Sequence, residues 1–417
     1  MIKILFLTHY FPPETAAPAN RTYEHVKRWK QKGVDITVIT NNPNHPNGKI
    51  YDGYNNKLFY KENIDGIEVI RVKTYATPNK GSIKRTLNFI LYFVMSIWAS
   101  FHVKNVDVII ATSPQFLCGL AGSIIKKIKK KPFILEIRDL WPDSIIAVGA
   151  LKKQNPVIKF LYILEKKMYF SATHIISLTG AFKKYIINCG YPENNISVIP
   201  NSVDLKQMEN VIEVETEFQK KGKFLCSYIG TFGIAHKLET ILYTADLLKE
   251  EKNIHFLLIG DGAERKKLGK MKENMDLENV TILPIQPKKN IPYFLKLSDI
   301  GLIVLRDNKL FKTVIPSKIF EYMATDNALI LSMPKGETTK ILNKGEFGVW
   351  VPPQTPKEFA QQIKLLYNNQ NKVKEMAKQG KLLVKNYYNR NTLAMEMLNI
   401  IKNEIAKKYH AKTQQFF

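Results

Sequence analysis

The chain has 417 residues, of which 45% are hydrophobic and 24% charged, a composition that excludes disordered, collagen-like and disulfide-scaffold proteins. Its 62 Lys and Arg against 37 Asp and Glu give a net charge of +25, which favours a polyanionic partner: nucleic acid, an acidic bilayer or a phosphate-bearing substrate. The 3 cysteines are far apart, which excludes a zinc cluster and indicates a reducing compartment. The apolar start, residues 1–7, lacks a signal-peptide cleavage site, so we expect a cytoplasmic protein.

Short apolar runs alternate with longer amphipathic stretches along the first half of the chain. Runs that are apolar at nearly every position are typical of parallel strands buried on both faces, so the alternation predicts a doubly wound α/β domain. The expected strands are residues 4–7, 36–40, 69–72, 106–111, 133–135 and 174–178, with a helix over 20–32 after the first of them.

The pattern pauses after Asp204, and the mixed acidic and basic stretch 205–222 is expected to be a linker. A second series of strands is expected at residues 224–229, 256–259, 280–283, 301–305 and 329–331. The chain therefore predicts two α/β domains, 1–205 and 206–388, with helical residues 389–417 at the end. Folds of this kind bind ligands at the carboxyl ends of their strands, so we expect a cleft between the two sheets.

Residues 87–103 contain no charged side chain and are flanked by Lys84, Arg85 and Lys104. Three interpretations remain open: a buried core helix, a helix docked on a membrane surface, and a membrane span. A span needs about 20 apolar residues, more than this stretch supplies. The basic flanks and the lysine-rich run 126–131 favour the membrane surface, although a solvated helix end explains that run equally well.

Two glycine turns follow apolar strands of the second series, Gly230-Thr231-Phe232-Gly233 and Gly260-Asp261-Gly262. A strand that ends in Gly-x-Gly before a helix presents free backbone N–H groups to an anion. A plain tight turn is the alternative, and the repetition within one domain favours the anion site.

A helix start is expected at Pro316-Ser317-Lys318, with Ser317 as the N-cap candidate. Lys318 in the first turn opposes the preference of helix starts for acidic residues. An anion bound there explains the lysine, and Glu321, one turn later, is placed to accept two hydroxyls of a ribose. An ordinary surface helix is the alternative.

The motifs together resemble the family 4 glycosyltransferases of the GT-B fold, in particular the bacterial group that builds O-antigen and capsule repeat units. They run in order over nearly the whole chain: residues 11–14 with Arg21, 33–40, 136–143, 198–204, 229–233, 260–262 and 316–324. Within this group, transferases proposed to move N-acetyl-L-fucosamine are the most similar. The resemblance implies two Rossmann-like domains facing a central cleft, with residues 389–417 returning to the N-terminal domain.

It also implies a retaining transfer from a nucleotide-sugar, usually a UDP-sugar, to a sugar carried on undecaprenyl diphosphate. The chain contains no Asp-x-Asp motif, so neither a metal nor another cofactor is expected. The enzyme is expected to lie on the inner face of the plasma membrane, against its anionic surface and without nucleic acid.

The resemblance assigns roles to individual residues. The expected donor-binding residues are Gly230, Thr231, Gly233, Gly260, Asp261, Gly262, Arg306, Ser317, Lys318 and Glu321. The expected acceptor-side residues are Pro13, Glu14, Arg21, Glu136 and Asp139, and the expected catalytic residues are Asp139, Lys318 and Glu321. Asp139 is expected to orient or deprotonate the acceptor hydroxyl, with Glu136 as the alternative; either carboxylate could instead cap the next helix and pair with Arg138.

The chain departs from the family pattern in three places. One is Ala16-Ala17-Pro18, where many members carry glycines in the N-terminal loop that faces the phosphates. Thr313 stands where the family has the first glutamate of its E-x7-E motif, whose second glutamate is Glu321, so the residue that recognises the donor sugar stays open. Thr231 and His236 stand at the family's cationic positions. We therefore expect Lys318 and backbone N–H groups to stabilise the departing UDP, with Arg306 and Lys237 as the alternative cations.

Two other classes of protein remain as alternatives. A sugar-nucleotide epimerase shares the GT-B architecture, and a basic nucleic-acid-binding protein without activity would explain the net charge. The second class predicts stacking aromatic residues interleaved with Lys and Arg in a recognisable module, and the sequence shows neither.

Overall fold

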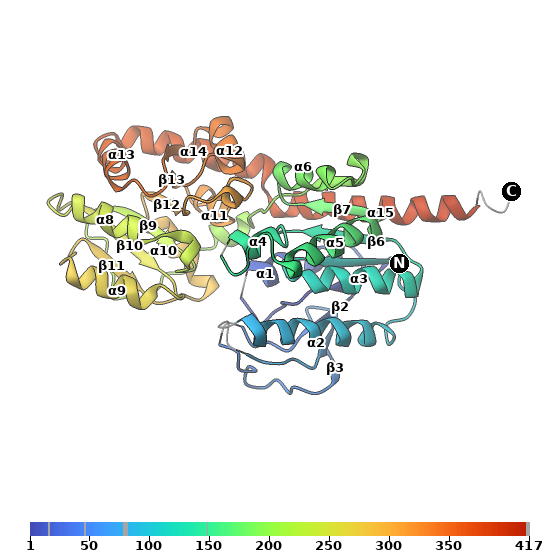
Figure 1. Cartoon of the computed structure of the whole chain (residues 1–417). Coiled ribbons are helices and arrows are strands. Elements are labelled where there is room, and N and C mark those ends of the chain that lie inside the picture. The colour runs from blue at the N-terminus through green and yellow to red at the C-terminus, as the bar shows by residue number, and fades with distance from the viewer. Residues whose placement is uncertain (16, 46, 78–81, 148, 414–417) are drawn as a thin grey trace. The chain divides into compact units, whose positions relative to one another are not determined.

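The computed structural model describes the chain except for residues 16, 46, 78–81, 148 and 414–417 (Figure 1). It divides into two compact units, residues 1–200 with 391–417 and residues 201–390. Each unit is built on a largely parallel sheet, so the expected α/β class with two domains of this kind is confirmed.

The N-terminal unit contains an eight-stranded sheet in the order β3-β4-β2-β1-β5-β6-β7-β8. Its strands are β1 Lys3–Leu7, β2 Asp35–Asn41, β3 Phe59–Ile64, β4 Ile67–Val72, β5 Val108–Thr112, β6 Phe133–Ile137, β7 His174–Ser177 and β8 Ile196–Val198. Neighbouring strands pair in parallel except β3, which runs antiparallel to β4 at the edge. β1 lies near the middle, with Leu5 in register with Thr37 on one side and Ile109 on the other.

Helices cover both faces of this sheet. They are α1 Ala17–Gln31, α2 Ser82–Ser100, α3 Phe116–Lys129, α4 Asp143–Ala147, α5 Pro156–Ser171, α6 Gly180–Asn188 and α15 Arg390–Thr413, with a 3-10 turn η1 at Glu193–Asn195. α1 and α15 pack together on one face, where the indole nitrogen of Trp29 donates to the carbonyl of Ala394 at 2.8 Å. α15 thus belongs to the core of the N-terminal unit.

α2, α3 and α5 lie side by side over the other face (Figure 1). Successive residues of a strand point to opposite faces, and β6 shows this clearly. Ile134 contributes to the core under α1 and α15, whereas Phe133 lies against α3. Gly122 allows that close approach, because a Cβ there would stand 2.5 Å from the Phe133 ring.

The C-terminal unit contains a six-stranded parallel sheet in the order β11-β10-β9-β12-β13-β14. Its strands are β9 Phe224–Ile229, β10 Ile254–Ile259, β11 Val280–Leu283, β12 Ile300–Val304, β13 Ala328–Ser332 and β14 Gly348–Val351. Alternate residues of β9 enter two separate cores: Phe224 and Tyr228 on one face, Leu225 and Ile229 on the other. β9 is therefore buried on both faces, as its sequence predicts.

The helices of this unit are α7 Leu205–Glu209, α8 Glu239–Leu247, α9 Arg265–Asn274, α10 Ile291–Leu297, α11 Lys318–Ala324, α12 Glu337–Gly345, α13 Pro356–Asn368 and α14 Gln370–Tyr387. Short 3-10 turns lie at η2 Ile234–His236, η3 Lys288–Asn290 and η4 Lys309–Lys312. The prediction of a linker over 205–222 is wrong. Met208 and Phe218 are buried in the same core as residues of α11, so this stretch packs on the C-terminal unit.

Residues 87–103 fall in α2 and the turn after it. In the described part of the chain, no helix has the length and apolar character that crossing a bilayer requires. α2 is not a fully buried core helix either, because one of its sides is buried and the other is exposed.

Candidate functional site

The hydroxyl of Tyr322 fixes α11 against the end of β9. It donates to the carbonyl of Ser227 at 2.8 Å and accepts the backbone N–H of Ile229 at 3.1 Å. Gly301 on β12 leaves room for the ring, because a Cβ there would stand 2.5 Å from it. These contacts bring the first turn of α11 to the carboxyl edge of the sheet, where parallel α/β folds bind ligands.

Lys318, in that first turn, holds its ammonium out of contact with solvent. Among the described residues Nζ has no hydrogen-bond partner, and it lies 3.7 Å from the centroid of the Tyr228 ring. Burial lowers the pKa of Lys318 to about 7, with the Glu321 carboxylate acting in the opposite direction. An ammonium without a hydrogen-bonding partner is costly to bury, so this cation is a candidate for binding an anionic ligand.

Gly230, which follows β9, belongs to the same cluster. A Cβ on residue 230 would stand 2.6 Å from the Lys318 ammonium. The ammonium can therefore lie where it does because residue 230 has no side chain. Thr231 follows, and its carbonyl accepts the Tyr228 hydroxyl at 2.9 Å. The structure thus brings together three of the residues expected to bind the donor.

Glu321 lies one turn further along α11. Burial raises the pKa of Glu321, while the cations of Arg390, Lys288 and Lys318 act to lower it. In the described part of the chain no group donates a hydrogen bond to this carboxylate. Its acceptor capacity is therefore available for hydroxyls of a ligand.

The expectation that Ser317 caps this helix is wrong. Ser317 makes no side-chain capping bond and already has helical dihedral angles, φ −60° and ψ −29°. A capping side chain acts from an extended backbone, which lets its oxygen reach back to the first N–H groups of the helix.

The two glycine turns pack against each other, and the N–H groups of three of their glycines donate hydrogen bonds within the protein. Gly230 and Gly260 donate to carbonyls of neighbouring strands at 2.9 and 3.3 Å, and Gly262 donates to the Asp261 carboxylate at 2.7 Å. A Cβ on Gly260 would stand 1.8 Å from the Gly230 carbonyl, and one on Gly262 would stand 2.5 Å from the Phe232 carbonyl. For these three N–H groups the tight-turn alternative holds, because the N–H groups on which the anion site depended are already bonded.

Two rings, the buried Tyr228 and the half-buried His236, complete the surroundings of Lys318, and sequence reasoning gave them no role in the donor site. Tyr228 lies under the ammonium, and the His236 ring lies edge-on to Tyr228 with the ring centroids 6.0 Å apart. Burial lowers the pKa of His236 to about 3, and the nearby Lys318 acts in the same direction. His236 is therefore a neutral ring. Two signals were available: Tyr228 is next to last in a buried strand that is followed by glycine, and His236 stands at one of the family's cationic positions.

The two alternative cations, Arg306 and Lys237, have different surroundings. The backbone N–H of Arg306 donates to the carbonyl of Ala235 at 2.9 Å, which ties Arg306 to the loop that carries His236. Lys237 instead pairs with Glu239 at 3.7 Å. Gly233 precedes this loop, and a Cβ there would meet the His236 ring at 3.4 Å. Thr313, at the family's first glutamate position, donates to the carbonyl of Leu310 at 2.7 Å.

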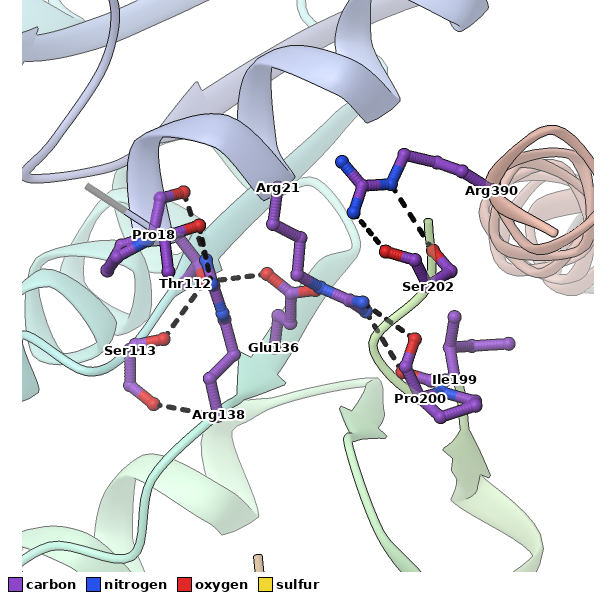
Figure 2. A network of polar contacts seen from close by, with 11 residues as sticks. Pro18, Arg21, Thr112, Ser113, Glu136, Arg138, Ile199, Pro200, Ser202 and Arg390 are labelled. Carbon is purple, nitrogen blue, oxygen red and sulfur yellow. Dashed lines mark hydrogen bonds and ion pairs between the residues drawn. The ribbon is translucent and has the colours of Figure 1, made fainter. Parts of the chain in front are cut away.

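In the N-terminal unit, Arg21 and Glu136 form a buried ion pair (Figure 2). Nε of Arg21 donates to Glu136 at 2.8 Å, and its terminal nitrogens donate to the carbonyls of Ile199 and Pro200 at 2.9 and 2.8 Å. Thr112 donates to the second oxygen of Glu136 at 2.6 Å. Although burial acts to raise it, the guanidinium groups of Arg21 and Arg138 hold the pKa of Glu136 below its usual value. The arrangement joins α1, β6 and the end of β8 and leaves Glu136 unsuited to act as a base.

Asp139 follows β6 and has a different environment. It accepts the Ser144 hydroxyl, in the first turn of α4, at 2.6 Å. Burial raises the pKa of Asp139 to about 6, against the effect of that hydrogen bond. Arg138 donates to the carbonyls of Pro18 and Ala17 at 3.1 and 3.2 Å (Figure 2). A carboxylate with a pKa close to neutral pH is suited to general acid–base chemistry, so the raised pKa favours Asp139 over Glu136 as the candidate.

Glu14 is buried after the Pro12–Pro13 pair and organises a loop beyond β2. One of its oxygens accepts the backbone N–H groups of Asn44 and His45 at 3.0 and 2.9 Å. The other is buried and has no hydrogen-bond partner among the described residues. Burial raises the pKa of Glu14. Pro13 itself is exposed.

Two family models match the chain. The model described as Glycosyltransferase Family 4 matches residues 19–207, and the model described as Glycosyl transferases group 1 matches residues 211–409. Together with the fold, these matches define the class of protein as a GT-B glycosyltransferase. The chain belongs to the family 4 glycosyltransferases, which confirms the expected family and enzyme class.

Relatives of known name agree with this assignment. "Putative colanic acid biosynthesis glycosyl transferase WcaI" of Escherichia coli K12 is 24% identical over 79% of this chain and 83% of its own length. "Probable glycosyltransferase WbjE" of Pseudomonas aeruginosa is also 24% identical, over 65% of this chain and 68% of its own.

Solved structures show the same fold at lower identity. Sucrose-phosphate synthase from Thermosynechococcus elongatus superposes with a TM-score of 0.77 at 15% identity, covering 98% of this chain and 100% of that one. HepE of Anabaena in complex with UDP superposes with a TM-score of 0.69 at 14% identity, covering 96% of this chain and 100% of that one.

Proposed function

We propose that this glycosyltransferase moves a sugar from a UDP-sugar to a sugar carried on undecaprenyl diphosphate, as a step in the synthesis of O-antigen or capsule. The observation that carries the proposal is the buried Lys318 ammonium without a hydrogen-bond partner among the described residues, beside the open carboxylate of Glu321. A diphosphate supplies the anion that this cation lacks, and a ribose supplies hydroxyls for the carboxylate. The names of WcaI and of the HepE complex with UDP agree with the pathway and the nucleotide.

In the proposed donor half of the site, Lys318 contacts the diphosphate and Glu321 holds the ribose. Arg306, Ser317 and the loop from Gly230 to Gly233 border the same ligand. Gly260, Asp261 and Gly262 complete the donor-binding set as a close-packed turn, since the N–H groups of the two glycines are bonded within the protein. The Lys318 charge stabilises UDP as it departs, without a bound metal or other cofactor. Stabilisation of developing charge by a fixed group of this kind is usually the largest contribution to such catalysis.

The proposed acceptor half belongs to the N-terminal unit and consists of Pro13, Glu14, Arg21, Glu136 and Asp139. The acceptor hydroxyl oxygen forms a bond to the anomeric carbon while the bond from that carbon to the phosphate oxygen breaks, and the electron pair of that bond leaves with UDP. Asp139 orients the hydroxyl, whose proton passes to the departing phosphate oxygen. Attack on the face from which UDP leaves retains the anomeric configuration. The protein would work as a peripheral enzyme at the inner face of the plasma membrane.

The test is an incubation of the protein with a panel of UDP-sugars, including UDP-N-acetyl-L-fucosamine, and a short lipid-diphosphate-linked sugar. We expect one donor to give acceptor-dependent UDP release and a product heavier by one sugar, with a retained linkage by NMR. A panel without acceptor-dependent turnover would contradict the proposal. Conversion of a donor to its epimer without acceptor would identify an epimerase instead, and an inverted linkage would overturn the proposed stereochemistry alone.

A further inference from the structure

We propose that the outer face of α2, α3 and α5 docks the N-terminal unit on an anionic phospholipid bilayer. The first observation concerns the exposed side of α2 and the turn after it. Large apolar side chains form one stripe there at helical spacing: Leu87, Ile90, Val94, Trp98 and Phe101. They are between 37% and 57% exposed.

The buried side of α2 mixes three polar residues with the buried Tyr92, Met95 and Ala99. Asn88, Ser96 and Ser100 are at most 6% exposed. The two serine hydroxyls donate within the helix, to the carbonyls of Phe93 and Ile97 at 3.0 and 2.7 Å. A helix between a protein core and water normally exposes a polar side, whereas the exposed side of α2 after residue 86 is apolar. The outward side of α2 therefore suits an apolar phase.

α3 and α5 extend this apolar surface. Ile124 and Ile128 of α3 are exposed, as are Val157, Phe160 and Ile163 of α5. Two lysines of α3 join the ends of the three helices: Lys126 donates to the carbonyl of Ser171 at 2.6 Å, and Lys129 donates to that of Val103 at 2.7 Å. The three helices lie side by side on one face of the sheet (Figure 1). We infer that their outer stripes form one surface.

The charges on these helices select the partner. α2, α3 and α5 contain eight Lys and Arg residues and one acidic residue, Glu165. Glu165 is buried and accepts the hydroxyls of Tyr169 and Tyr185 at 2.7 and 3.0 Å. The charge exposed on this surface is therefore positive throughout. Apolar side chains rimmed by lysine suit the interface of a bilayer with anionic lipid. In a two-fold dimer the same positive surface of each copy would face the other, and the like charges would repel.

The same helix reaches the carboxyl end of the central strands. On the inner side of α2, the Tyr92 hydroxyl donates to the carbonyls of Thr8 and Ile39 at 2.9 and 3.0 Å. The Phe89 ring meets the ring of His9 at 5.2 Å between centroids. Docking of α2 would thus hold the edge of the sheet that ends at His9 close to the lipid. This link depends on the proposed lipid-carried acceptor; the docking itself does not.

The experiment is flotation of the full-length protein with vesicles of phosphatidylglycerol and phosphatidylcholine, and with vesicles of phosphatidylcholine alone. We expect binding to the mixed vesicles that weakens with added salt, and little binding to the neutral ones. V94E/F101E should lower the partition coefficient at least about tenfold. Leu365→Glu, a matched change at an exposed leucine of α13 in the other unit, should leave it unchanged. Both variants change exposed side chains, and circular dichroism checks that they fold.

A second measurement reports on Trp98 directly. Brominated lipid should quench the fluorescence of the wild-type protein and quench that of Trp98→Phe markedly less. Of the other three tryptophans, Trp29 is fully buried, Trp141 is half-buried against Phe116, and Trp350 is half-buried in β14 of the C-terminal unit. The inference is overturned if the wild-type protein does not float with mixed vesicles, if it binds neutral vesicles equally well, or if L365E and V94E/F101E weaken binding alike. It is also overturned if V94E/F101E converts a dimer to a monomer without altering flotation. The flotation and quenching assays contain neither donor nor acceptor, so they do not depend on the proposed function. If the protein transferred sugar to a soluble acceptor but did not bind vesicles, this inference would be wrong and the proposed function would stand.

Discussion

The ammonium of Lys318 and the ring of Tyr228 form the tightest cation–π contact among the described residues, with 3.7 Å between Nζ and the ring centroid. A ring face attracts a cation, but it replaces only part of the hydration that the cation loses on burial. Lys318 is therefore held in a position where it destabilises the protein unless an anion approaches. The first two predictions follow from this.

Lys318→Met should lower kcat/KM for the donor about 100-fold and leave the melting temperature equal or higher. The charge that stabilises the departing UDP is lost, while a buried ammonium is replaced by an apolar chain of similar length. Initial rates and calorimetry measure the two effects. Lys312→Met, at an exposed lysine of the same unit, is the control. Activity within about threefold of wild type would remove Lys318 from the site.

UDP binding should take up protons at pH 8. Burial lowers the pKa of Lys318 to about 7 in the free protein, so much of it is neutral at that pH, and a bound diphosphate restores the charged form. Calorimetry in buffers of different ionisation enthalpy measures the uptake. It should approach one proton per UDP for wild type and fall strongly in Lys318→Arg, whose guanidinium stays charged. Equal uptake in the two proteins would assign the proton to another group.

Asp139→Asn should lower kcat by about 100-fold or more and remove a pH dependence centred near 6. The wild-type rate should fall as the pH drops below the raised pKa of about 6, where burial keeps Asp139 protonated. Asp52→Asn, at an exposed carboxylate, is the control. A pH–rate profile unchanged in Asp139→Asn would contradict the assignment.

The same carboxyl group gives a stability prediction of defined sign. Its folded pKa of about 6 lies above the usual 3.8, so the stability that it contributes is present at low pH and is lost as the pH rises through 6. The amide introduced by Asp139→Asn does not titrate. Urea unfolding of wild type and variant should therefore show the variant gaining relative stability between pH 4 and about 6.5.

Glu136→Gln should lower the free energy of unfolding by about 3 kcal/mol or more, because it leaves the Arg21 guanidinium buried without its charged partner. Urea titration at constant pH measures the loss. Glu68→Gln, which breaks an exposed pair with Lys61 at 3.1 Å, should change stability by less than about 1 kcal/mol. Equal effects of the two substitutions would show that the Arg21–Glu136 pair is no more than a surface interaction.

The central strands could be predicted because burial on both faces makes them apolar at nearly every position, as in Phe224–Ile229. Edge strands lack this signal. Phe59–Ile64 carries a lysine and a glutamate and pairs only with β4, and Ile196–Val198 is three residues long. The linker prediction failed because the charged residues of 205–222 obscured Met208 and Phe218. Met208 lies on α7, which packs against α11 more than 100 positions away, and the Phe218 ring lies 5.6 Å from that of His255.

The part of the candidate site that could be predicted from the sequence is a residue that conflicts with its local position. Lys318 opposes the helix dipole at the start of α11, and its ammonium is buried without a hydrogen-bond partner among the described residues. The N–H groups of Gly230, Gly260 and Gly262 could not be read in this way, because their partners lie on other strands and on a loop carboxylate. Glu136 and Asp139 look equivalent in the sequence. Their different roles depend on Arg21, which is 115 residues away from Glu136.

The position of α15 has a consequence for the synthesis of the protein. Met397 and Ile401 fill the core of a unit whose strands all lie within the first 200 residues. A nascent chain generally folds from its N-terminus, domain by domain, but here the first sheet lacks part of its core until residues 393–405 have been translated. The C-terminal unit, residues 201–390, contains every strand of its sheet and has no such delay. The second half of the chain is thus able to fold before the first, and a ribosome stalled before residue 390 would carry a nascent chain whose first domain is incomplete.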